Sequence, residues 1–267
     1  MMNKLCSIVA ASMLLAMHSA LAGEISDVGT KAYWGANAHA YQDVIGSSTY
    51  DISGATITRV GNVLTITIAT NFAGHAGSEP RSAPGGIAYG DVFLAQAWNP
   101  AGSSALDPHH LTDNAANGTL WSYGFSLDNR WSNAGGGFTL YKLNGKTNAE
   151  DIKTTNSFMS CALGSQCYYR DGQAAAVDTA SSAAKNTGLS GTWSVIADKS
   201  LSFKIDIGSS DLLQYSSFAM HWGETCGNDV IEGIVSNVPA PGTVPLLAMA
   251  LGAMLLMRRR QSLPAKR

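Results

Sequence analysis

Charged residues are scarce in this chain of 267 residues. Lysine, arginine, aspartate and glutamate together make up 13% of it, and the formal net charge at pH 7 is -2. A protein that binds nucleic acid needs a basic surface to neutralise phosphates, and this composition offers no excess of positive charge. The composition therefore excludes a nucleic-acid partner.

The common catalytic motifs are also absent. The chain has no G-x-S-x-G elbow, no phosphate-binding Walker loop, no HExxH zinc site and no CxxC pair. Each of these motifs places a nucleophile, a phosphate cradle or metal ligands at a fixed spacing. Their absence favours a structural or binding protein over an enzyme, and no cofactor is predicted apart from the calcium considered below.

Cysteines are few, and whether they form disulfides depends on the compartment that the protein occupies. Of the four, Cys6 lies in the N-terminal segment that we expect to be removed, which leaves an odd number. In an oxidising compartment Cys161 and Cys167 are close enough in sequence to pair, and Cys226 is the alternative partner of either. Oxidised protein should therefore keep one free thiol.

Residues 23–237 contain neither a long apolar run nor a sustained helical period. Apolar and polar residues alternate along several short runs instead. The runs Ala55–Val60 and Val63–Ile68 flank Gly61-Asn62, which is the pattern of a β-hairpin with a two-residue turn. Further strand-like runs occur at Asp91–Ala97, Leu120–Leu127, Gly137–Leu143, Thr192–Ala197, Leu201–Ile207, Ser217–Trp222 and Val230–Val235.

Many short strands separated by small polar residues predict an all-β domain over residues 23–237. We predict a single antiparallel β-sandwich that is jelly-roll-like, with a barrel as the alternative. The stretch Ala174–Ser190 is rich in alanine, serine and threonine and lacks apolar periodicity. It is predicted to be a long surface loop, with a short helix as the alternative.

Residues 1–22 have the three parts of a secretory signal peptide. Lys4 gives the basic start, Leu5–Met17 the apolar middle, and Ala20-Leu21-Ala22 the small-x-small exit. We predict export with cleavage after Ala22. A buried N-terminal helix is the alternative interpretation.

Residues 238–267 form a second terminal signal. Val244–Met257 carries no charge, and with the residues back to Val238 it approaches the roughly twenty that cross a bilayer as a helix. The arginine cluster that follows, Arg258–Arg260, marks the cytoplasmic side under the positive-inside rule. We predict a membrane-anchored precursor whose body faces outward.

This tail is similar to a PEP-CTERM sorting segment, which has a short proline motif, an apolar helix and an arginine cluster in the same order. The residues that carry the resemblance are Val238, Pro239, Pro241, Gly242, Thr243, Arg258, Arg259 and Arg260. The resemblance implies cleavage by exosortase, a membrane protease that passes its substrates to the cell surface or the extracellular matrix. Ala240 stands where the family usually has glutamate. A plain C-terminal anchor is the alternative.

An internal block, Trp222–Gly233, fits W-x-x-x-C-G-N-D-x-I-x-G. It resembles a block found upstream of PEP-CTERM tails in one group of exported proteins, and Asp43–Gly46 and Gly90–Leu94 resemble further blocks of that group. The resemblance of these blocks implies no established activity. The association of the tail family with the cell surface and the biofilm or exopolysaccharide matrix leads us to expect a structural or glycan-binding protein. The alternative is a secreted carbohydrate-active hydrolase on a β-sandwich scaffold.

Within this block, residues 227–229 are predicted to form a turn between two strands. As an alternative, carboxylates at strand ends gather into a calcium site, because Ca²⁺ takes six to eight oxygen ligands. The candidate ligands are Asp229, Glu224, Asp43 and Asp91.

Two sets of residues are candidates for contact with sugars, one for hydrolysis and one for binding. Hydrolysis needs two carboxylates on either side of a glycosidic bond, and the candidates are Glu224, Asp229 and Glu232. Binding needs flat aromatic surfaces, and Trp121 and Trp131, near glycine-rich turns, are the candidates for stacking on matrix polysaccharide. Core packing is the alternative for any tryptophan.

Overall fold

The structure is a computed structural model. It describes residues 21–27, 32–33, 43–77, 83, 85–101, 113–160 and 169–236. The predicted sorting tail, residues 1–20 of the predicted signal segment, Cys161 and Cys167 lie outside the described residues. Within the described residues, no helix is long and apolar enough to cross a membrane.

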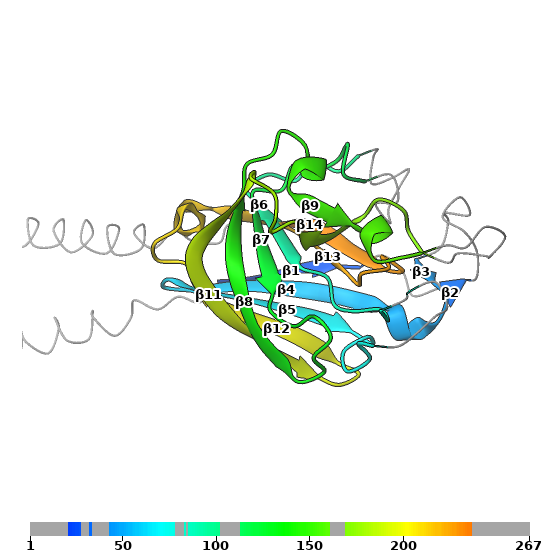
Figure 1. Cartoon of the computed structure of the whole chain (residues 1–267). Coiled ribbons are helices and arrows are strands. Elements are labelled where there is room, and N and C mark those ends of the chain that lie inside the picture. The colour runs from blue at the N-terminus through cyan, green and yellow to red at the C-terminus, as the bar shows by residue number, and fades with distance from the viewer. Residues whose placement is uncertain are drawn as a thin grey trace, which may run out of the picture.

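The described chain consists mostly of antiparallel strands, which confirms the predicted all-β class (Figure 1). The strands are β1 (Leu21–Ser26), β2 (Ala32–Tyr33), β3 (Val44–Ile45), β4 (Ile52–Val60), β5 (Val63–Thr70), β6 (Val92–Ala95), β7 (Tyr123–Leu127), β8 (Gly135–Leu143), β9 (Ile152–Thr154), β10 (Ala174–Val177), β11 (Ala184–Ile196), β12 (Ser200–Asp206), β13 (Ser217–Gly223) and β14 (Val230–Ser236). Helical structure in these residues is limited to the 3-10 turns η2 (Ser48–Tyr50), η3 (Asn148–Glu150), η4 (Thr155–Ser157) and η5 (Asp211–Gln214).

Ten strands form one continuous sheet in the order β1-β4-β5-β12-β11-β8-β7-β6-β13-β14. The sheet curls until its two edge strands, β1 and β14, pack against each other (Figure 1). Two glycines permit this approach: a Cβ on Gly23 would collide with Val235, and one on Gly233 would lie 2.7 Å from Ile25. The result is a nearly closed, sandwich-like fold.

The hairpin predicted around Gly61 is confirmed. β4 and β5 pair on either side of a two-residue turn, in which Gly61 has a φ of 61° that favours glycine. Leu64, Ile66 and Ile68 are buried, while the threonines between them are half-buried. One face of the hairpin therefore belongs to the core, as the alternation predicts.

Two hydrophobic clusters stabilise the fold. The larger one fills the curled sheet, and the smaller one lies between the outer face of that sheet and the two-stranded β9–β10 sheet, whose β10 contacts β7 and β13. β6 is buried on both faces for this reason. Val92 and Leu94 belong to the inner cluster, and Phe93 belongs to the outer one.

The prediction of a surface loop over Ala174–Ser190 is wrong. This segment contains β10 and the first half of β11, and β11 pairs with both β8 and β12. Most side chains of β11 are exposed or half-buried. The half of β11 that is predicted as a loop is held by its backbone ladder with β8 rather than by side-chain burial, so apolar periodicity could not mark it.

Candidate metal centre

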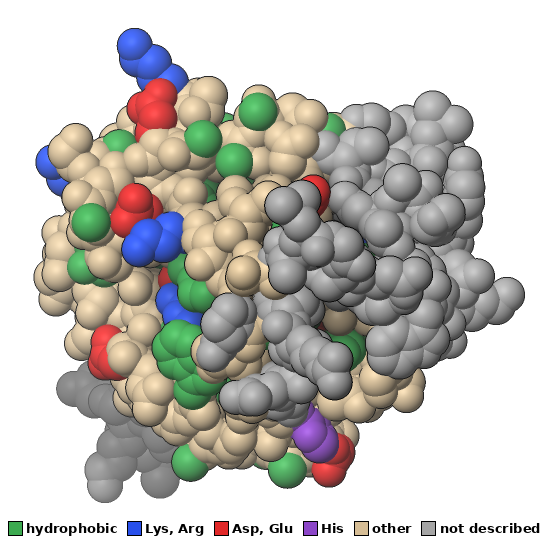
Figure 2. Space-filling model, turned by 45° about the vertical axis from the view of Figure 1, so that its right-hand side comes forward, with side chains coloured by type: hydrophobic (Ala, Val, Ile, Leu, Met, Phe, Trp, Pro, Cys, Tyr) green, Lys and Arg blue, Asp and Glu red, His purple; other side chains and the backbone are tan. Residues whose placement is uncertain are grey.

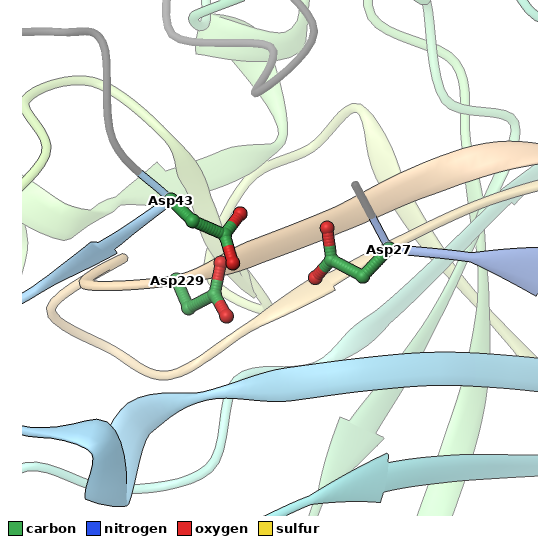
Figure 3. Close-up of side chains that lie close together, drawn as sticks. All are labelled: Asp27, Asp43 and Asp229. Atoms are coloured by element: carbon green, nitrogen blue, oxygen red, sulfur yellow. The ribbon is translucent and has the colours of Figure 1, made fainter. Parts of the chain in front are cut away.

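Three aspartates from distant parts of the sequence meet at one end of β1 and β14. Asp27 follows β1, Asp43 precedes β3, and Asp229 precedes β14. One carboxylate oxygen from each lies within 4.8 Å of the others, and the side chains point toward one another (Figure 3). Oxygens that share one Ca²⁺ at about 2.3–2.6 Å lie at most about 5 Å apart. The spacing therefore fits a single ion.

The β13–β14 hairpin fixes the position of Asp229. Its Oδ2 accepts a hydrogen bond from the Ile52 amide at 2.7 Å, and its Oδ1 accepts one from the Val230 amide at 2.8 Å. The neighbouring Asn228 carbonyl accepts a hydrogen bond from the Ile45 amide at 2.8 Å. The predicted turn is confirmed, and these bonds attach it to β3 and β4.

A buried arginine adjoins the three aspartates. The Nη1 of Arg170 lies 3.7 Å from Asp229 Oδ1, and its Nη2 donates to the backbone carbonyl of Asp43. The Arg170 amide also donates to the carbonyl of Cys226 at 3.2 Å. Arg170 thus holds the Asp43 segment against the hairpin, and among the described residues it brings one positive charge to the carboxylates.

A fourth carboxylate adds to this imbalance. Glu224 is buried, and its Oε2 accepts a hydrogen bond from the Asp229 amide at 3.4 Å. The other oxygen, Oε1, and the Oδ1 of buried Asn228 accept no hydrogen bond from the described residues. A buried oxygen without a donor is costly, and a hard cation is a partner that would satisfy it.

The pKa values of these acids respond to the same imbalance. Burial raises the pKa of Glu224 to about 8. Burial, and then the charge of Asp27, raises the pKa of Asp229 well above its ordinary value. Without a cation, protons offset part of the negative charge. A divalent ion at the cluster would add its positive charge to that of Arg170.

Asp91, also predicted as a calcium ligand, does not join this cluster. Its carboxylate accepts hydrogen bonds from the amides of Leu127 and Val177 at 3.0 and 2.8 Å, and it pairs with Arg130 at 3.2 Å. These donors occupy both oxygens. Asp91 therefore joins β7 to β10 and is a structural group, which corrects the prediction.

Sequence reasoning missed Asp27 and Arg170. Asp27 stands at the end of a strand, as Asp43 and Asp229 stand at the start of theirs, and that position is the one signal that could have pointed to it. Nothing in the local sequence around Arg170 marks it as a partner of these acids. The three-dimensional path of the chain brings both residues to the centre.

The three carboxylates considered for hydrolysis are all buried. Glu224 and Asp229 lie in the hairpin turn described above. Glu232, on β14, accepts a hydrogen bond from Trp98 Nε1 at 2.8 Å and lies 3.2 Å from the Nδ1 of His221. Asp229 and Glu232 are engaged by hydrogen bonds from their own surroundings, and Glu224 is withdrawn from solvent.

Of the two tryptophans predicted to stack on sugars, Trp131 is 44% exposed and Trp121 only 4% exposed. The Trp121 ring lies 5.7 Å from that of His221, in the outer cluster with Ile152 and Val177. The prediction that Trp121 is exposed is wrong, because that cluster covers it.

Cys226 has a free, buried thiol. Burial, and then the charge of Glu224, raises the pKa of this thiol well above its ordinary value. The thiolate is the reactive form of cysteine, so this residue is shielded from reagents in the folded protein.

Comparisons of this chain with protein-family models, with curated proteins and with solved structures found no match.

Proposed function

We propose that this is an exported protein whose β domain is braced by one Ca²⁺ ion and acts at the cell surface or in the extracellular matrix as a structural or glycan-binding component. The observation that carries the metal proposal is the meeting of Asp27, Asp43 and Asp229. An ion at this point would join the end of β1, the segment before β3 and the β13–β14 hairpin. The jelly-roll-like sandwich remains part of the proposal, supported by the nearly closed sheet.

Calcium fits this centre better than a transition metal. The donors are three carboxylate oxygens, which suit hard cations, whereas the side chains that softer metals prefer do not take part in the cluster. Ca²⁺ tolerates irregular geometry and suits ligands drawn from separate loops. Export also supports this choice, because extracellular modules use calcium sites of modest affinity.

The ends of the domain support the proposed orientation. β1 begins at Leu21 and β14 ends at Ser236, and Gly23 packs against Val235. Both ends of the described domain therefore lie at one pole. The aspartates lie at the other end of the same strands, about 20 Å away at roughly 3.3 Å per residue. The membrane segment predicted after the C-terminal end of the domain would therefore leave the metal centre facing away from the membrane.

The sorting proposal rests on the resemblance of residues 238–267 to a PEP-CTERM tail. We propose an exosortase-type protease as the processing partner and the membrane as the transient anchor. The test is the mature C-terminus, determined by mass spectrometry in a host that carries the protease. Loss of Arg258–Arg260 supports sorting, and a chain that retains them reduces the tail to a simple anchor.

Thermal melting tests the metal proposal. An ion at about 100 times its Kd stabilises a protein by about 2.7 kcal/mol. In a domain of this size 1 kcal/mol corresponds to roughly 2–4 °C, so removing Ca²⁺ with EDTA should lower the Tm by roughly 5–10 °C. Asp43→Asn, which should bind Ca²⁺ at least roughly tenfold more weakly, should reduce this response by about half or more. Asp206→Asn, which changes an exposed aspartate on β12, is the matched control and should keep it.

Two outcomes would contradict the metal proposal. One is a Tm that EDTA leaves unchanged in the wild-type protein. The other is an equal EDTA response in Asp43→Asn and the wild type, which would place any bound calcium elsewhere.

A further inference from the structure

A second feature lies away from the metal centre: an open hollow of about 420 Å³ between the end of β7 and the outer β9–β10 sheet. Its size falls within the range of small-molecule sites, roughly 300–1,000 Å³. In Figure 2, basic and acidic side chains lie beside hydrophobic ones on the face turned to the viewer. The side chains that line the hollow indicate which ligand it fits.

The charges at the hollow are balanced in pairs. Arg130 is paired with Asp91 at 3.2 Å, and the Nζ of Lys153 lies 3.5 Å from Asp178 Oδ1. Arg130 and Lys153 both line the hollow, so each brings its own counter-ion. A site without excess charge gives an ionic ligand no electrostatic advantage. It favours a neutral polar ligand.

The apolar part of the hollow includes an aromatic ring held in a defined orientation. The Arg130 guanidinium lies 5.4 Å from the centroid of the half-buried Phe158 ring, and its Nη1 donates to the Tyr89 carbonyl at 3.1 Å. Leu127 and Val177, both buried, extend the apolar lining. Such a surface suits the C–H face of a sugar ring, because that face is apolar and flat.

The rim adds hydroxyl groups from three different segments. Ser126 belongs to β7, Ser157 to η4, and Thr179 follows β10. A hydroxyl both donates and accepts hydrogen bonds, so the rim matches a ligand that carries many hydroxyls. We infer that this hollow binds an uncharged saccharide. The inference rests on the proposed function in one respect, that an exported matrix protein meets extracellular polysaccharide.

Calorimetric titration of the purified protein, with Ca²⁺ present throughout, tests the inference. The probes are neutral tetrasaccharides of glucose, mannose and galactose, and a tetrasaccharide of a uronic acid as the charged comparison. At least one neutral probe should bind roughly tenfold more tightly than the uronate. Phe158→Leu keeps the apolar volume but removes the ring, and it should weaken binding by roughly tenfold.

A second variant does not depend on the folding of Phe158→Leu. Thr179→Trp should fill the hollow from its exposed rim and abolish binding, whereas Ser209→Trp, at an exposed turn outside the hollow, should leave binding intact. The inference is overturned if no neutral probe binds, if the uronate binds best, or if Thr179→Trp binds like the wild type. It is also overturned if Trp131→Ala abolishes binding while Thr179→Trp does not. The EDTA response of the Tm is independent of these results, so either proposal can fail alone.

Discussion

Replacing Glu224 with glutamine should change how the stability of the calcium-free protein depends on pH. Burial raises the pKa of Glu224 to about 8 in the folded protein. In the unfolded chain the group returns to about 4.3. The folded state therefore holds a proton that the unfolded state releases between these values. The stability linked to this group is present below the unfolded pKa and is lost as the pH rises through the folded pKa.

The size of the effect follows from one proton. Its linkage gives a slope of about 1.4 kcal/mol per pH unit, so the wild type should lose at most about 4 kcal/mol between about pH 5 and pH 8 through Glu224. Glutamine has nearly the same shape and does not titrate. Glu224→Gln should therefore lack this contribution. Asp229 and Cys226 respond to the charge of Glu224, whereas groups remote from it contribute equally in both proteins. The relevant quantity is the difference between the unfolding free energies of the wild type and Glu224→Gln.

Urea unfolding in EDTA, followed by the fluorescence of buried Trp222 and Trp193, measures this difference. The advantage of Glu224→Gln over the wild type should grow steadily from about pH 5 to pH 8. Glu24→Gln, which changes an exposed glutamate on β1, should follow the wild type. An advantage of Glu224→Gln that does not vary with pH would refute the reasoning, because it would mean that Glu224 is not held protonated by its surroundings.

Three further predictions concern other parts of the domain. Asp91→Asn removes the negative partner of Arg130, and it should lower the free energy of unfolding by roughly 3 kcal/mol in urea titrations while the EDTA response persists; an unaffected stability would contradict the pairing. The thiol of Cys226 should react with iodoacetamide only after unfolding, and rapid alkylation of the native protein would show that this part of the core opens. A chain from Gly23 to Asn237 should be soluble, with a circular dichroism spectrum of β-structure, and a strongly helical spectrum would contradict the fold.

Local chemistry explains which parts of the fold the sequence could predict. The hairpin around Gly61 is marked by alternating side chains and by a turn that requires a positive φ, and both signals lie within a few residues. The second half of β11 is predicted as a strand at Thr192–Ala197, but the first half has no such signal, because its small polar side chains remain largely outside the core. Its position depends on pairing with β8, a strand that ends at Leu143 and is therefore distant in the sequence.

The candidate centre could be predicted only in part for a related reason. The positions of Asp43 and Asp229 at strand ends pointed to ligands, but the same argument also selected Asp91. Asp91 is engaged instead by Arg130 and two backbone amides. Asp27 joins the centre because the sheet curls until β1 lies beside β14. Closure of the sheet is a property of the whole chain.

The tryptophans illustrate the same limit. Trp121 and Trp131 both lie near glycine-rich turns, so the residues around them predict the same exposure for both side chains. Burial separates them: the outer cluster covers Trp121 and leaves Trp131 exposed. That cluster exists because the β9–β10 sheet packs on the outside of β7 and β13, which no local pattern indicates.

Calorimetric titration of the metal-stripped protein with Ca²⁺ tests the central claim most directly. The three aspartates around one point predict saturable binding of about one ion per chain. Asp43→Asn should bind at least roughly tenfold more weakly, since it loses one charged ligand, and Asp206→Asn should bind like the wild type. Absence of saturable binding, or equal affinity in Asp43→Asn and the wild type, would contradict the account.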